Sequence, residues 1–250
     1  MKSISVIILS HNEEQNITDC VESVPQEWEI IVIDDDSSDR TVALAESLKR
    51  DIKVFKHSLN NNFSEQRNFG LSKATCEWIL FLDADERLNK NLIEELEAKT
   101  RQEINNGFRI KRVDHMWGKT LQFGELKNMW LLRFAKRGSG EWTGKVHEVW
   151  NIKGKIGKTT QVLDHYPHPT ITEFLKEINF YTTLRARELY KSKAKVSGID
   201  IILYPKAKFL QNYFWRLGFK DGIPGFIYAV LMSFHSFLVR GKLWLLYHQK

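Results

Sequence analysis

Hydrophobic residues fall into four short blocks over the first hundred positions, and polar stretches separate these blocks. Each block is a run made mostly of Val, Ile, Leu, Phe or Trp, which is typical of a strand buried on both faces of a sheet. The polar stretches carry apolar residues at helical spacing. This alternation predicts an α/β fold whose parallel sheet is flanked by helices on both faces. The predicted strands are 5–9, 29–33, 52–55 and 78–82.

The pattern changes in the second part of the chain. Residues 107–170 contain several Gly and Trp but no long apolar helical stripe, so we expect short mixed strands and loops that extend the sheet. From residue 171 onward, apolar positions recur every three or four residues. Two further helical stretches are predicted near 199–219 and 224–247. We therefore expect a C-terminal helical extension after the α/β part.

Three of the four predicted strands end in clusters of polar residues. In a parallel sheet the carboxyl ends of the strands lie along one edge, and ligands bind beyond that edge. We therefore expect the three clusters to converge on one site. They are Ser10-His11-Asn12-Glu13-Glu14, Asp34-Asp35-Asp36 and Asp83-Ala84-Asp85-Glu86.

Asp83 and Asp85 follow the fourth predicted strand with one residue between them. Both carboxylates can lean toward one cation, and hard oxygen ligands of this kind suit Mg²⁺ or Mn²⁺, which would bridge them to a diphosphate. The alternative is a strand-end turn with solvated acids, in which Asp85 is a helix cap. The apolar run before Asp83 and the further acid Glu86 favour the metal.

Asp34 and Arg67 are further candidates for ligand contacts. Asp34 is the first polar residue after the second strand, and its carboxylate can accept hydrogen bonds from a base and a ribose. The alternative is that the acids of this cluster cap the following helix. Arg67 is expected in the first turns of the next helix, where its planar guanidinium can approach a phosphate. The alternative for Arg67 is a solvated surface side chain.

Composition and missing motifs exclude several classes of protein. The 250 residues suffice for one or two domains, and 42% hydrophobic with 27% charged residues is ordinary for globular proteins. The chain has no G-x-x-x-x-G-K-[ST] and no correctly placed G-x-G-x-x-G, so a P-loop NTPase or a dinucleotide oxidoreductase is not expected. Cys20 and Cys76 are too few for a disulfide framework, and no signal peptide is evident. We therefore expect a cytoplasmic protein.

Four segments together resemble the nucleotide-binding half of family 2 glycosyltransferases, in the same order and at similar spacing. This resemblance implies a GT-A fold, a nucleotide-sugar donor such as a UDP-sugar, a divalent metal at the D-x-D motif, and inversion at the anomeric carbon. One departure is the run of three acids in the second segment, which leaves open whether Asp34 or Asp35 faces the base. The segments are SVIILSHNEE (5–14), IIVIDDDSSD (30–39), SEQRNFG (64–70) and FLDADE (81–86).

The resemblance also implies which residues bind the nucleotide sugar and how the chain is divided. We expect residues 1–170 to form the catalytic domain, with a nucleotide-sugar half (1–105) and an acceptor half (106–170), and residues 171–250 to form the helical extension. The expected nucleotide-sugar contacts are Ser10, His11, Asn12, Glu14, Asp34, Asp35, Arg67, Asp83 and Ala84.

More loosely, the remainder is similar to the branch that adds glucose or heptose-region sugars to the lipopolysaccharide inner core. This similarity implies a hexose donor, glucose in our expectation, and a lipid-linked or lipopolysaccharide-core saccharide as acceptor. The segments that carry it are LLRF (131–134), WTGKVHE (142–148), LDHY (163–166) and GFKDGIPG (218–225).

An inverting transfer needs a general base near the acceptor hydroxyl. Glu148 in Val-His-Glu (146–148) is the preferred candidate because it follows glycines that allow a close loop approach; the alternative is a surface strand pair. Glu86 is the other candidate base, although its neighbour Asp85 would bind metal. His165 is a candidate third metal ligand beside Asp83 and Asp85, since imidazole is compatible with Mn²⁺, or else a structural histidine.

The C-terminal segment is basic and aromatic. From Lys191 onward, ten Lys/Arg and two acids give a net charge of +8. The whole chain has a net charge of +6, so residues 1–190 carry −2. Residues 222–239 hold no charged side chain, and cations beside Trp and Tyr suit a lipid headgroup region. We expect helices that lie on the inner face of the cytoplasmic membrane as a peripheral anchor. The alternatives are helices packed on the core, an oligomer contact or a spanning helix.

Three other functions use similar residues. Nucleic-acid binding is not expected, because the cations alternate with large aliphatic residues instead of forming a polar basic face. A nucleotidyltransferase would also place paired aspartates on a parallel sheet, but residues 8–16 lack the glycines of a phosphate loop. A non-catalytic sugar-nucleotide-binding membrane adaptor is the third possibility, and the intact Asp83, Asp85 and Glu148 disfavour it.

Overall fold

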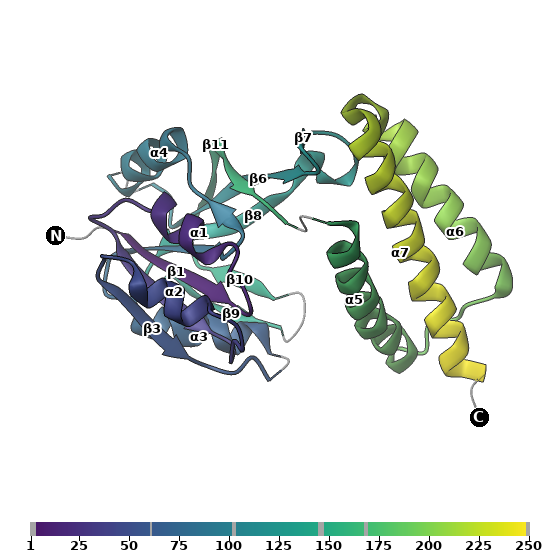
Figure 1. The fold of residues 1–250 in the computed structure, drawn as a ribbon, viewed down its shortest axis with the longest axis horizontal. Helices are drawn as coiled ribbons and strands as arrows, with labels where there is room; N and C mark the ends of the chain where they lie inside the picture. Colours follow the sequence, from purple (N-terminus) through teal and green to yellow (C-terminus); the bar gives the residue numbers. More distant parts are fainter. Residues whose placement is uncertain (1–3, 61, 102–103, 145–147, 168–169, 249–250) are drawn as a thin grey trace. The chain divides into compact units, whose positions relative to one another are not determined.

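The chain folds around one mixed sheet and a group of long helices (Figure 1). Among the residues described, the sheet has nine strands in the order β3-β2-β1-β4-β8-β6-β11-β5, and β7 pairs with β6 at its side. The structure is a computed structural model that describes residues 4–60, 62–101, 104–144, 148–167 and 170–248.

The four predicted strands form the parallel part of the sheet. Strand β1 pairs with β2 on one side and with β4 on the other, and β2 pairs with β3, all parallel. Every residue of β2 is buried: the apolar residues 30–33 as predicted, and the terminal Glu29 and Asp34 as well. The predicted bounds are confirmed to within one residue at each end. The strands are β1 (Ile4–Ser10), β2 (Glu29–Asp34), β3 (Ile52–Lys56) and β4 (Trp78–Asp83).

Helices cover the two faces of this parallel part. Residues of α1, α2 and α4 share one hydrophobic cluster with one face of β1 and β2, and α3 shares a second cluster with the other face. On α3, a Cβ at Gly70 would lie 2.7 Å from Ile7 Cγ2, so glycine lets the helix approach the sheet closely. The helices are α1 (Ile17–Ser23), α2 (Thr41–Ser47), α3 (Phe63–Lys73) and α4 (Lys90–Thr100).

The middle of the chain extends the sheet with antiparallel strands, as predicted. Strand β8 pairs with β4 and with β6, and β11 pairs with β5. Strands β6 and β11 have ten residues each, so they are longer than the short strands that the sequence pattern indicates. These strands are β5 (Glu86–Arg87), β6 (Gly107–Met116), β7 (Lys119–Leu121), β8 (Trp130–Lys136) and β11 (Ile156–His165), and the 3₁₀ helix η1 (Gly124–Asn128) precedes β8. Strands β9 (Gly140–Thr143) and β10 (Val149–Ile152) pair with each other as a separate two-stranded antiparallel hairpin.

The C-terminal region is helical, as predicted, but its middle part is irregular. The helix predicted near 199–219 ends early, because a π-helical turn follows it and Leu217 adopts a left-handed conformation with φ of 61°. The elements are α5 (Ile171–Lys191), α6 (Gly198–Leu210), the π-helix η2 (Gln211–Trp215), the 3₁₀ helix η3 (Gly218–Asp221) and α7 (Gly222–His248).

Two compact units can be distinguished along the chain. The first consists of Met1–Arg112 and Trp130–His165, and the second of Val113–Met129 and Tyr166–Lys250. Residues 113–129 therefore pack with the helices, whereas the sequence analysis assigns them to the acceptor half. The reason is apolar packing: Met116, Leu121 and Leu126 share a hydrophobic cluster with residues of α5 and α7.

Candidate active site

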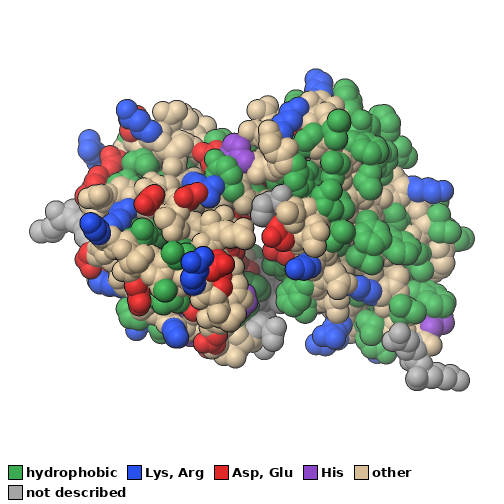
Figure 2. All heavy atoms as spheres, in the orientation of Figure 1, with side chains coloured by type: hydrophobic (Ala, Val, Ile, Leu, Met, Phe, Trp, Pro, Cys, Tyr) green, Lys and Arg blue, Asp and Glu red, His purple; other side chains and the backbone are tan. Residues whose placement is uncertain are grey.

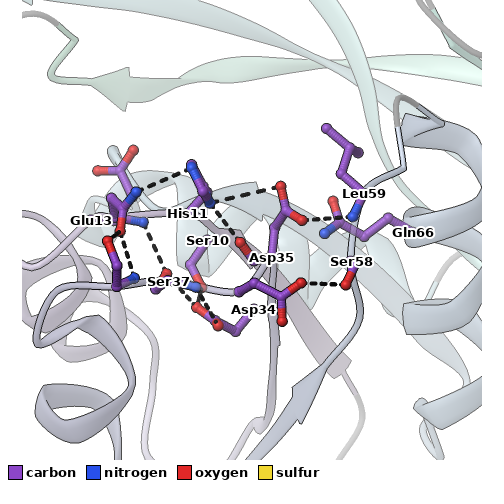
Figure 3. A network of polar contacts seen from close by, with 12 residues as sticks. Ser10, His11, Glu13, Asp34, Asp35, Ser37, Ser58, Leu59 and Gln66 are labelled. Carbon is purple, nitrogen blue, oxygen red and sulfur yellow. Dashed lines mark hydrogen bonds and ion pairs between the residues drawn. The ribbon is translucent and has the colours of Figure 1, made fainter.

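The carboxyl ends of the central parallel strands bring the three polar clusters to one edge of the sheet. Strand register places Ser10 beside Asp34 and Leu9 beside Asp83. The loops that follow β1 and β2 are joined by hydrogen bonds between their polar residues (Figure 3). The predicted convergence is therefore present in the fold, and each side chain can be assigned a place in it.

Asp34 is an internal part of this edge. Its side chain is fully buried, and its Oδ1 accepts a hydrogen bond from Ser10 Oγ at 3.3 Å and from Ser37 Oγ at 2.5 Å. The other oxygen, Oδ2, accepts from the Ser37 amide at 2.9 Å. Both carboxylate oxygens are therefore engaged in shaping the loop after β2, and burial keeps them from a ligand.

Asp35 lies at the rim, beside His11 (Figure 3). Its side chain is 21% exposed, and its Oδ1 accepts a hydrogen bond from the Leu59 amide at 2.6 Å. Oδ2 lies 3.7 Å from His11 Nδ1, and that nitrogen is 2.5 Å from the Asp35 backbone oxygen. Asp35 and the exposed His11 therefore present polar groups at the edge where a ligand would arrive.

Asn12 and Glu14 tie the loop after β1 to the loop after β2. Asn12 has a positive φ of 54°, and its Oδ1 accepts a hydrogen bond from the Ser38 amide at 2.8 Å. Glu14 Oε2 accepts from Arg40 Nε at 3.2 Å. These contacts hold the loops in register, so the structure gives both residues an observed role in shaping the site.

Two arginines hold Asp83 at the end of β4. Arg67 Nη2 lies 3.3 Å from Asp83 Oδ1, and Arg133 contacts both carboxylate oxygens, with Nη1 3.2 Å from Oδ1. Burial acts to raise the pKa of Asp83, but the charges of Arg133 and Arg67 outweigh it and hold this pKa well below its usual range. Asp83 is therefore ionised at neutral pH and fixed in orientation.

Arg133 is a site residue that the sequence analysis does not single out. It lies on β8, is 5% exposed, and its Nη2 is 3.5 Å from Glu86 Oε1 in addition to its contacts with Asp83. The signal in the sequence is a charged residue inside the apolar run of β8. A buried charge is stable only when it is paired, so such a residue points to a carboxylate partner elsewhere in the chain.

Glu86 is fully buried beneath the Asp83 turn. Its Oε2 accepts a hydrogen bond from the Asp83 amide at 2.9 Å, and its Oε1 lies 3.9 Å from Arg112 Nη1. Burial raises the pKa of Glu86, although the nearby charge of Arg133 acts in the opposite direction. A carboxyl that is closed off from solvent cannot reach an acceptor hydroxyl. Its observed contacts support the turn.

Glu148 and Arg67 line a cavity of about 430 Å³ in the first unit. Arg67 Nε donates to Glu148 Oε1 at 3.0 Å, and the Arg67 guanidinium carbon lies 4.7 Å from the centre of the Trp142 ring. The structure thus brings together Arg67, Asp83 and Glu148, which are far apart in the sequence. His147, next to the proposed base, lies outside the described residues.

Asp85 and His165 form the second half of the D-x-D environment. Asp85 Oδ2 lies 3.1 Å from His165 Nε2, and the buried Ala84 separates Asp85 from Asp83. No group of three or more His, Cys, Asp or Glu side chains that could hold a metal ion occurs within the described ranges. Asp85 and His165 are therefore the side chains that could bind a metal ion here, because the Asp83 carboxylate is paired with Arg67 and Arg133.

Such a pair of ligands fits a metal that is shared with a substrate. Mg²⁺ and Mn²⁺ in phosphate-binding enzymes take one or two carboxylates from the protein and complete their shell with water and phosphate oxygens. An imidazole ligand shifts the preference toward Mn²⁺. Asp85 and His165 are thus suited to a divalent ion that arrives with a diphosphate.

Comparisons with known proteins identify the family of this chain. The family model described as "Glycosyl transferase family 2" matches residues 5–152. The lipopolysaccharide core biosynthesis glycosyltransferase LpsC of Rhizobium meliloti is 30% identical over 96% of this chain and 92% of its own length. An uncharacterized glycosyltransferase of Rickettsia felis is also 30% identical, over 97% of this chain and 90% of its own.

Among solved structures, residues 1–349 of Staphylococcus aureus TarS in complex with UDP-GlcNAc match with a TM-score of 0.53 at 16% identity. This match covers 100% of the present chain and 93% of that one. At such low identity it concerns the fold alone. The expected fold class, an α/β GT-A fold with a C-terminal helical region, is confirmed.

Proposed function

The chain belongs to glycosyltransferase family 2, and from that premise we propose that it is an inverting, metal-dependent hexosyltransferase. We propose a UDP-sugar, with glucose as the sugar, as the donor. The proposed acceptor is a lipid-linked or lipopolysaccharide-core saccharide, which is in keeping with the name of the relative LpsC. The observation that carries this proposal is the grouping of Arg67, Asp83 and Glu148 beside one cavity at the carboxyl edge of the sheet.

The donor would lie along the edge formed by β1, β2 and β4. We infer that Asp35 at the rim, and not the buried Asp34, accepts hydrogen bonds from the base, while His11 lies beside it. Asp83, ionised and held by its two arginines, is placed to accept from a ribose hydroxyl. Asp85 and His165 would hold the divalent ion, which neutralises the charge that develops on the leaving diphosphate.

The acceptor would occupy the cavity lined by Glu148. There the Glu148 carboxylate takes the proton of the attacking hydroxyl while that oxygen forms a bond to the anomeric carbon and the diphosphate leaves from the opposite face. Arg67 orients the Glu148 carboxylate through its 3.0 Å ion pair. Tryptophans 130, 142 and 150 line the same cavity. Trp142 and Trp150 are buried and stack on each other, so we propose Trp130 as the ring that lies against the apolar face of a sugar.

A screen of nucleotide sugars tests the proposed activity. Purified protein is incubated with UDP-glucose, UDP-GlcNAc and other donors, with Mn²⁺ or with excess chelator, and release of the nucleotide is measured together with thermal stability. We expect metal-dependent hydrolysis and stabilisation with a UDP-sugar. A protein that binds these donors but hydrolyses none with any acceptor preparation would instead be a non-catalytic binder.

Substitution of Glu148 by Gln should preserve donor binding and lower the rate of transfer by about a hundredfold, since the base is lost while the shape is retained. Donor affinity and turnover are measured on the same preparation. The matched control is Glu141→Gln, which changes an exposed glutamate of the same hairpin and should leave turnover unchanged. If Glu148→Gln stays within a few-fold of the unchanged protein, Glu148 is only the partner of Arg67.

We further propose that the helical unit places the protein at a membrane surface, where a lipid-linked acceptor resides. Hydrophobic side chains gather on its surface (Figure 2). Ile199 is 66% exposed, Trp215 86% and Ile223 75%. By length and composition alone, Gly218–His248 could also cross a bilayer, with mean hydropathy 1.6 in its best window and 33% of that window buried. The basic charge of this region favours an anionic surface.

Vesicle binding tests this placement. The protein should bind anionic vesicles, and binding should weaken as salt rises yet leave a salt-resistant remainder from inserted side chains. Trp215→Ala with Ile223→Ala should lower that remainder by roughly a hundredfold or more, since about 1.5–3 kcal/mol is lost with each large apolar side chain that leaves the interface. Ile104→Ala, which changes a residue exposed to 70% in the other unit, is the control. Equal losses in both variants would contradict the interfacial proposal.

A further inference from the structure

A cavity of about 910 Å³ lies within the helical unit, bordered by residues of α5, α6, η2 and α7. Three cations line it, and among the described residues that border it there is no carboxylate. Aromatic side chains make up much of the remaining wall. The residues on which the argument rests are Arg185, Lys208, Arg240, Tyr204, Phe214 and Trp215.

Arg240 is the best-held cation of this cavity. Its guanidinium carbon lies 3.6 Å from the centre of the Tyr204 ring, and its Nη1 donates to Ser236 Oγ at 3.0 Å and to the Ser236 backbone oxygen at 3.2 Å. In the part of the chain that the structure describes, no carboxylate lies within ion-pair distance of Arg240. Its charge is thus fixed in place by an aromatic face and a neutral partner, and Asp200 acts on it only from beyond ion-pair distance.

The other two cations of the cavity, unlike Arg240, each form an ion pair. Arg185 Nη1 is paired with Glu188 at 3.0 Å, and Lys208 is paired with Glu125. They can add contacts to a ligand, but each already has a counter-charge. The excess positive charge of the cavity is therefore centred on Arg240, whose planar fork is suited to the oxygens of a phosphate.

The entrance of the cavity is apolar and open to solvent. Phe214 is 54% exposed and Trp215 is 86% exposed, and both border the cavity. A small inorganic anion would leave these rings in water. A ligand with a phosphate at one end and hydrocarbon at the other would contact both the guanidinium and the rings.

We propose that this cavity binds the phosphate group of an anionic lipid, with Arg240 as its principal contact and Phe214 and Trp215 against the apolar part of the lipid. This proposal rests on the membrane placement proposed above and is independent of the glycosyl-transfer chemistry. It changes the expected nature of that contact: the helical unit recognises one lipid molecule in a defined site as well as a charged surface.

Binding to vesicles of phosphatidylcholine, with and without phosphatidylglycerol, separates a defined site from diffuse attraction. Arg240→Gln should weaken binding to the anionic vesicles by about tenfold or more, because a charge-assisted hydrogen bond to phosphate is lost. Lys206→Gln removes the same charge from an exposed position of α6 that does not border the cavity, and should cost roughly fivefold or less. Arg240→Lys, which keeps the charge without the planar fork, should fall between Arg240→Gln and the unchanged protein.

Equal losses for Arg240→Gln and Lys206→Gln, together with full binding by Arg240→Lys, would overturn the proposal in favour of diffuse attraction. Inorganic phosphate is the probe for a free anion: it should stabilise the protein thermally far less than a short-chain phosphatidylglycerol does. Equal stabilisation by both would also overturn the lipid assignment. Hydrolysis of a soluble donor should be unchanged in all three variants, which shows that they fold. Absence of hydrolysis in the unchanged protein would count against the proposed enzyme activity alone.

Discussion

Replacement of Asp85 by Ala should lower sugar transfer by about three orders of magnitude, equivalent to about 4 kcal/mol in the transition state. The reason is that Asp85 and His165, 3.1 Å apart, are the only strand-end pair of the described residues to which we assign metal binding. Without the carboxylate, the charge on the leaving diphosphate is poorly compensated. Turnover with a saturating UDP-sugar and Mn²⁺ is the measurement.

A second readout separates metal loss from other damage. Titration of Mn²⁺ in the presence of UDP should show weaker metal binding in Asp85→Ala than in the unchanged protein. His165→Asn should show a smaller loss, since an amide oxygen can still act as a ligand. Unreduced turnover of Asp85→Ala, or of the unchanged protein in excess chelator, would contradict the metal assignment.

Substitution of Asp83 tests the D-x-D motif less directly than substitution of Asp85. Its carboxylate lies against Arg67 and Arg133, whose side chains are 7% and 6% exposed. Removal of Asp83 would take one counter-charge from both buried guanidiniums and leave Arg67 with Glu148 and Arg133 with Glu86, so stability would fall along with activity. Any loss of transfer in Asp83→Ala must therefore be compared with the fraction of protein that is still folded.

Substitution of Arg133 by Met should destabilise the protein by about 3–5 kcal/mol at neutral pH, the range for removing one partner of a buried ion pair. Asp83 and the fully buried Glu86 would then lose the positive charge that both share. The free energy of unfolding in urea measures the effect. Arg133→Lys should recover part of it, because it restores the charge but not the two-pronged contact.

The loss of stability caused by Arg133→Met should be smaller at acidic pH. Arg133 lowers the pKa of Asp83 in the folded protein, so the stability that this pair contributes is fully present above the unfolded-state pKa of about 3.9 and is lost as pH falls from there through the lower folded-state pKa. The double variant Arg133→Met with Asp83→Asn should be less destabilised than the sum of the single variants. A loss that is the same at neutral and at strongly acidic pH would show that packing, not charge, is what Arg133 provides.

The parallel part of the fold could be predicted from the sequence because burial on both faces of a strand demands an apolar residue at every position. Strands β1, β2 and β4 satisfy this rule apart from Ser5 and the polar residues at strand ends, and their bounds were within one residue of the prediction. The long antiparallel strands β6 and β11 could not be recognised in this way. They mix exposed and buried positions, so their pattern resembles that of loops.

The candidate site could be predicted only where its residues are close together in the sequence. The D-x-D pair and the acidic cluster after β2 follow directly from strand ends. The ion pairs of Arg67 with Glu148 and of Arg133 with Asp83 join residues 81 and 50 positions apart, and no spacing rule indicates them. Nor could the sequence distinguish Asp34 from Asp35, because their difference is one of burial, which the loop after β2 decides.

The way the chain passes between its two units limits how the protein can be dissected. It crosses after Arg112, returns after Met129 and crosses again after His165, so three peptide connections join the units. A shortened gene product that stops at residue 170 would keep residues 113–129 but lose the helices on which Met116, Leu121 and Leu126 pack. Those apolar side chains would be left in water, and we expect such a fragment to be insoluble. For the same reason, the helical unit cannot be grafted onto another enzyme by a single fusion joint.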